Sequence, residues 1–134
     1  MVFVDRTKEK KKLENAISSL PIGLTVLYGR RRVGKTSLLR RVVREKDIYF
    51  LADRSEASHQ REVCSKIISD KISDFDKVKY PDWEILLTSL NHRVTDSFCL
   101  CLDEFPYLVE QSPELPSVLQ KLLDKKTIKI HKQK

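Results

Sequence analysis

One segment of the chain has the residue types and spacing that bind phosphate. Residues 29–36 read Gly-Arg-Arg-Arg-Val-Gly-Lys-Thr and match the pattern G-x-x-x-x-G-K-[ST] of a phosphate-binding loop. Such a loop turns sharply out of a strand, wraps its amide N–H groups around a phosphate, and enters a helix whose positive dipole end faces the same anion. Its two glycines permit the close wrap. The pattern therefore predicts a nucleotide site.

The residues of this loop have separate expected roles. Lys35 would extend along the β- and γ-phosphates, and the Thr36 hydroxyl would take one position on Mg²⁺. The full set of predicted nucleotide-binding residues is Gly29, Arg30, Arg31, Arg32, Val33, Gly34, Lys35, Thr36 and Ser37. The alternative is a glycine-rich turn with a surface lysine. The β-prone run 24–28 before the loop and the helix-compatible run 37–43 after it favour the phosphate-binding interpretation.

A second group of residues that could do chemistry is the pair Asp103-Glu104, which directly follows the apolar run 98–102. A carboxylate at the tip of a buried strand can hold the Mg²⁺ that bridges the β- and γ-phosphates, and we assign this role to Asp103. Glu104 is the predicted catalytic residue, placed to orient or deprotonate the attacking water. The alternative is two acidic residues in a loop. The acidic pair favours an ATPase over a nucleoside kinase or GTPase. The sequence also contains no Asn-Lys-x-Asp motif of the type with which GTPases recognise the base.

The elements that must position these residues alternate between strands and helices. Such alternation implies an α/β fold with a parallel sheet and right-handed crossovers. We expect strands at 24–28, 48–51 and 98–102. We expect helices from about 6 to 19, from the loop to about 46, from 58 to 74, from 81 onward, and from 117 to 124. In the helix after Pro81, Trp83 belongs to an apolar stripe that faces the core, with a binding role for Trp83 as the alternative.

Composition limits the class of protein. The chain has 134 residues, which allows one domain, and 40% hydrophobic with 34% charged residues is ordinary for a soluble protein. The longest apolar run is far too short to span a membrane, and charge at Asp5 excludes a signal-peptide core, so we expect a cytoplasmic protein without membrane contact. The 3 cysteines lack metal or disulfide spacing, and Cys99 and Cys101 are expected to be small buried residues of a strand.

The net charge of +7 is concentrated in the first 50 and the last ten residues. A basic rim would focus the phosphates of a nucleotide, or of a nucleic acid, toward the site. The alternative for the lysines at 8 and 10–12 is a solvated face of the first helix.

A likeness to a known family lies in three segments, Phe3–Arg6, Tyr28–Thr36 and Cys101–Leu108. In these segments the chain is similar to the archaeal-type ATPases, which are relatives of the AAA+ and STAND ATPases. The likeness covers roughly residues 3–124. It implies a three-layer P-loop NTPase fold, ATP and Mg²⁺ as ligands, and a position near the adenine for Asp5 and Arg6, whose alternative roles are a helix cap and a surface ion pair. It also places the arginines 30–32 in the loop, where the alternative is that they point to solvent.

The likeness implies further elements that this chain does not contain. Members of the family continue into a strand with a polar sensor residue, and that strand would lie between the P-loop strand and the strand ending at Asp103. We therefore expect an incomplete, N-terminal portion of the fold, with unpaired edges on both strands and a short strand stub at 127–130 at most. The expected organisation is an ATPase domain at 1–124 and a basic tail at 125–134.

The resulting functional expectation is an ATP–Mg²⁺ binding domain that hydrolyses ATP only when C-terminal elements complete it. The alternative is a truncated regulatory or nucleic-acid-associated module with a vestigial nucleotide site, whose basic ends contact phosphate backbones. No recognised nucleic-acid motif accompanies the basic residues. The sequence does not indicate an oligomeric state.

Overall fold

The computed structural model describes residues 11, 14–15, 17–29, 43–125 and 129–133 of the chain. These residues form a four-stranded sheet in which every pairing is parallel, in the order β2-β3-β1-β4. The strands are β1 (Gly23–Gly29), β2 (Ile48–Leu51), β3 (Ser97–Asp103) and β4 (Lys129–Gln133). The expected α/β class with a parallel sheet is confirmed, and the three predicted strands differ from the observed ones by one residue at most at each end.

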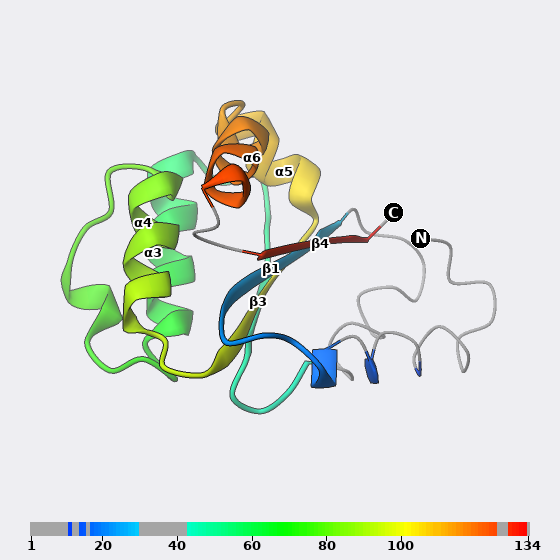
Figure 1. The fold of residues 1–134 in the computed structure, drawn as a ribbon. Helices are drawn as coiled ribbons and strands as arrows, with labels where there is room; N and C mark the ends of the chain where they lie inside the picture. The colour runs from blue at the N-terminus through cyan, green and yellow to red at the C-terminus, as the bar shows by residue number, and fades with distance from the viewer. Residues whose placement is uncertain (1–10, 12–13, 16, 30–42, 126–128, 134) are drawn as a thin grey trace.

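Helices cover one face of this sheet (Figure 1). They are α3 (Ala57–Ile68), the 3-10 turn η1 (Phe75–Lys77), α4 (Trp83–Arg93), α5 (Phe105–Gln111) and α6 (Leu115–Asp124). Helix α4 begins where the side chain of Asp82 accepts a hydrogen bond from the Ile85 N–H at 2.8 Å, which satisfies one of the free donors of the first turn. Among the described residues no helix is long and apolar enough to cross a membrane.

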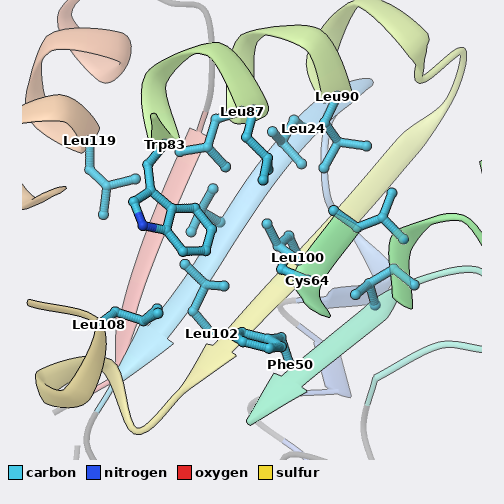
Figure 2. Packing of buried hydrophobic residues seen from close by; sticks show 14 of the residues in the cluster. Leu24, Phe50, Cys64, Trp83, Leu87, Leu90, Leu100, Leu102, Leu108 and Leu119 are labelled. Atoms are coloured by element: carbon cyan, nitrogen blue, oxygen red, sulfur yellow. The ribbon is translucent and has the colours of Figure 1, made fainter. Parts of the chain in front are cut away.

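The larger part of the core lies between these helices and the sheet. Side chains of β1, β2 and β3 pack there against α3, α4, α5 and α6, as Figure 2 shows around Trp83, Leu100 and Leu102. Trp83 is 1% exposed, as expected for a core residue. All seven residues of β3 are buried, because the sheet is covered on both faces and this strand lies in its interior.

A smaller cluster lies on the opposite face of the sheet. Its buried members are Ile17, Leu27, Cys99 and Cys101, with Leu20, Val43 and Tyr49 packed against them. The interpretation of the two strand cysteines as small core residues is therefore confirmed. Burial raises the pKa of the Cys99 thiol to about 12, so this thiol stays protonated and unreactive at neutral pH.

A partly buried ion pair joins the amino ends of β2 and β3. The Asp47 side chain is fully buried and receives the Arg44 guanidinium at 2.7 Å (Nε to Oδ2) and 3.0 Å (Nη2 to Oδ1). The Asp47 carboxylate also accepts the backbone N–H of Cys99 at 2.9 Å, across to β3. The Arg44 guanidinium donates to the Ser97 hydroxyl at 3.0 Å. One carboxylate thus fixes the start of two strands.

Several helix predictions need correction. The helix expected at 58–74 ends at Ile68, although Ile72 still packs on the core from the turn that follows. Val43 to Lys46 are not helical, so the predicted end of the preceding helix at about 46 is wrong. The last helix begins at Leu115, with Pro116 in its first turn, and α5 is a helix that the sequence did not predict. The described residues from 11 to 18 are helical, as expected.

The expected gap between the P-loop strand and the third strand is also wrong. Strands β1 and β3 pair directly along their whole length, from Gly23 opposite Ser97 to Gly29 opposite Asp103. Strand β4 pairs with the other side of β1, from Thr25 opposite Lys129 to Gly29 opposite Gln133. Both β1 and β3 are therefore interior strands, because direct pairing satisfies the backbone groups that a gap would leave open. The stub expected at 127–130 is a strand at 129–133, so part of the predicted tail belongs to the sheet. The boundary at 124 stays a prediction.

Candidate nucleotide site

The carboxyl ends of the parallel strands bring two of the predicted site residues together. Gly29 is the last residue of β1, and its Cα is the register partner of Asp103, the last residue of β3. Leu51, the last residue of β2, is the partner of Asp103 on the other side. The remaining predicted loop residues, at 30–37, lie outside the described residues, as do Asp5 and Arg6. The carboxyl edge of an open α/β sheet is where such folds bind ligands.

Asp103 is fully buried, and donors among the described residues bind both oxygens of its carboxylate. The Tyr49 hydroxyl donates to Oδ2 at 2.5 Å, and the backbone N–H of Glu104 donates to Oδ1 at 2.9 Å. The carbonyl oxygen of Asp103 accepts the Ala52 N–H at 3.0 Å, which extends the pairing of β2 and β3 past the end of β2. The orientation of this carboxylate is therefore fixed by its neighbours, as a metal ligand requires.

Glu104 lies at the turn from β3 into α5. Its backbone is left-handed, with φ 58° and ψ 43°, a conformation that costs a non-glycine residue roughly 1 to 2 kcal/mol. The left-handed turn ends the strand abruptly, and α5 begins at the next residue with Pro106 in its first turn. The Glu104 carbonyl accepts the Tyr107 N–H at 2.9 Å, which closes the turn. Glu104 is partly exposed, so it is accessible from the sheet edge.

Aromatic side chains support the same edge. The rings of Tyr28 and Phe105 lie with centroids 4.3 Å apart, which ties the end of β1 to the start of α5. Burial raises the pKa of the Tyr28 hydroxyl, so it is neutral near pH 7. The Arg54 guanidinium lies over the ring of Tyr107, 5.0 Å from its centroid, and brings the loop after β2 against α5.

Sequence reasoning missed Tyr49 and Arg54. Tyr49 contacts a carboxylate 54 positions away, and the sequence around it reads as an ordinary buried strand. Its one available signal was its place in a strand of a parallel sheet, next to the strand that ends at Asp103. Register is needed to use that signal, because it decides which side chains of neighbouring strands meet.

Metal binding at this edge would need ligands beyond the protein side chains described. Within the described ranges, no three His, Cys, Asp or Glu residues gather closely enough to hold an ion. Magnesium is commonly held by one or two carboxylates, with substrate phosphates and water as its other ligands. A single fixed carboxylate such as Asp103 fits that pattern.

The amino ends of the strands, at the other end of the sheet from Asp103, border a different surface. A hollow of about 200 Å³ lies beside the amino end of β3 and includes the basic side chains of Lys46, Lys71 and Arg93. Lys46 is already paired there, with Asp96 at 3.1 Å and the Ser97 hydroxyl at 3.2 Å. This hollow is at the other end of β3 from Asp103, so it is separate from the candidate nucleotide site.

Comparison with known proteins relates the chain to proteins of archaea. An uncharacterized protein of Methanocaldococcus jannaschii is 33% identical over 125 residues, which are 92% of this chain and 26% of that protein. The chain thus spans about a quarter of the length of this relative. An uncharacterized ATP-binding protein of the same organism is 42% identical over 48 residues, which are 36% of this chain and 81% of that protein. No solved structure matches the chain.

The family comparison covers nearly the whole chain. Residues 3–133 match the family described as an ATPase domain predominantly from Archaea. The match includes the sequence pattern at 29–36, the strand end at Asp103 and β4. The chain therefore belongs to this family of archaeal ATPase domains.

Proposed function

We propose that the chain binds ATP–Mg²⁺ at the carboxyl edge of its sheet. The loop from Gly29 to Ser37 surrounds the phosphates, Lys35 neutralises the β- and γ-phosphates, and Thr36 and Asp103 are ligands of Mg²⁺. The observation that carries the proposal is the register of Gly29 with Asp103. It puts the start of the phosphate-binding sequence beside a fixed carboxylate on the neighbouring strand.

The choice of ATP draws on the family and on the printed description of one relative. The family consists of ATPase domains, and the shorter relative is described as ATP-binding. The cytoplasmic location expected from the sequence remains part of this proposal.

Hydrolysis is a separate part of the proposal. Glu104 is partly exposed at the sheet edge and directly follows the metal ligand, so it can act on a water molecule that attacks the γ-phosphate. We expect any turnover to depend on Glu104, so binding and hydrolysis can be tested separately. In this scheme Glu104 acts on the attacking water. The affinity for the ground-state nucleotide therefore does not depend on Glu104.

Two variants separate binding from turnover. Replacing Lys35→Ala should weaken ATP–Mg²⁺ binding by about 1.5 to 3 kcal/mol, which is the range for hydrogen bonds to charged groups and corresponds to roughly 10- to 150-fold in Kd. Replacing Glu104→Gln should leave Kd nearly unchanged and remove any phosphate release. Calorimetry and a phosphate assay give both readouts. Equal Kd values for the parent and the Lys35 variant would contradict the site, whereas full turnover by the Glu104 variant would contradict only its catalytic role.

A further inference from the structure

Tyr49 is the side chain that reaches from β2 to the carboxylate of Asp103. Tyr49 is the register partner of Cys101, two residues before Asp103 along β3. Its phenol therefore leans along the sheet toward the carboxyl edge, where the hydroxyl donates to Oδ2 of Asp103 at 2.5 Å. The short distance is typical of an O–H donor on a carboxylate oxygen.

The position of the Tyr49 ring is fixed by packing. It lies against the smaller core cluster, which contains Cys99 and Cys101 from the adjacent strand. A side chain packed in this way loses little further freedom when its hydroxyl bonds to Asp103. The second oxygen of Asp103 is held by the Glu104 N–H. The carboxylate is thus held from two directions, by a neighbouring strand and by its own turn.

We propose that Tyr49 is a positioning residue that sets the orientation of Asp103 for Mg²⁺. This inference rests on the proposed function, because it takes Asp103 as a ligand of the metal. Donors to a ligating carboxylate fix the direction of its remaining lone pairs, and loss of such a partner typically costs about 10- to 100-fold in metal affinity. Tyr49 itself does not touch the metal or the nucleotide in this scheme.

The test compares ATP affinity in Mg²⁺ with ATP affinity in EDTA, measured by calorimetry on four proteins. These are the parent, Tyr49→Phe, Asp103→Asn and the control Tyr80→Phe. Tyr80 is a matched control because it is partly buried and its hydroxyl also makes a short bond, 2.6 Å to the Phe75 carbonyl, in the η1 region. A thermal melt by circular dichroism checks that each variant is folded.

The ratio of the two affinities gives the contribution of the metal. We expect Tyr49→Phe to lower this ratio about 10-fold while the affinity in EDTA stays unchanged, and Tyr80→Phe to leave both values unchanged. A purely structural role would lower both affinities together. An unchanged or increased ratio in Tyr49→Phe, with a reduced ratio in Asp103→Asn, would overturn the inference and leave the proposed function standing. A parent protein without any Mg²⁺ effect would instead contradict the metal site itself.

A second measurement does not need the Tyr49 variant to fold. The chain has 4 tyrosines, so in protein labelled with 3-fluorotyrosine the ¹⁹F signal of Tyr49 can be assigned by elimination with variants of the other three. The Tyr49 signal should shift more with ATP and Mg²⁺ than with ATP and EDTA, because metal binding changes the charge that its hydroxyl faces. Equal shifts in the two conditions, in a parent protein whose ATP affinity depends on Mg²⁺, would contradict the positioning role.

Discussion

At the residue scale, the junction of Asp103 and Glu104 combines a fixed carboxylate with a strained backbone. The Glu104 N–H donates to the Asp103 side chain, the backbone of Glu104 is left-handed, and α5 begins immediately afterwards. A glycine would adopt this conformation at lower cost, yet the chain has glutamate there. Strain of this kind is typical of functional sites, where the side chain is needed more than the local stability.

The strain at Glu104 can be measured with two substitutions. Glu104→Gly should be more stable than Glu104→Ala by about 1 kcal/mol, because alanine pays the left-handed penalty and glycine does not. Both variants remove the same carboxylate, so the comparison isolates the backbone. Urea unfolding gives the two free energies. A more stable alanine variant would mean that residue 104 is not left-handed in solution.

At the element scale, local patterns predicted the strands well and their arrangement poorly. The run 98–102 is continuously apolar, and β3 is buried on both faces as that pattern indicates. The end of α3 was predicted too late because Ile72 keeps helical spacing although it packs from a turn. Helix α5 was missed because Pro106 follows the acidic pair closely. Direct pairing of β1 with β3 depends on contacts between distant residues, which local patterns do not encode.

The ion pair at the amino ends of β2 and β3 should contribute strongly to the free energy of unfolding. Asp47→Ala removes the partner of Arg44 and the acceptor of the buried Cys99 N–H, and should cost about 3 kcal/mol of unfolding free energy. The matched control is Asp96→Ala, which removes an exposed carboxylate paired with Lys46 and should change stability little. Urea titrations of both variants check this, and equal losses would refute a special role for Asp47.

At the scale of the whole molecule, the two ends of the sheet differ in chemistry. The carboxyl ends bring Gly29 beside the buried Asp103, and the amino ends border the basic hollow that contains Lys46 and Arg93. Motif order and parallel pairing predicted that both residues lie at the carboxyl ends of strands, but the expectation from the sequence was a gap between those two strands, which in fact pair directly. The sequence did not predict the hollow, because its residues come from segments that only the fold brings together. The basic side chains at the amino ends of the strands would also attract a phosphate-bearing ligand. The location of bound ATP therefore decides which end of the sheet holds the nucleotide site.

The most direct measurement of the central claim is therefore paramagnetic broadening of backbone amide NMR signals by Mn²⁺ bound with ATP. Mn²⁺ replaces Mg²⁺ on oxygen ligands and broadens the signals of nearby nuclei. We expect the amides of Gly29, Asp103 and Glu104 to broaden, while those of Asp96 and Ser97 at the other end of β3 stay sharp. Broadening of Asp96 and Ser97 with sharp signals at Asp103 and Glu104 would place the nucleotide at the amino edge and contradict the account.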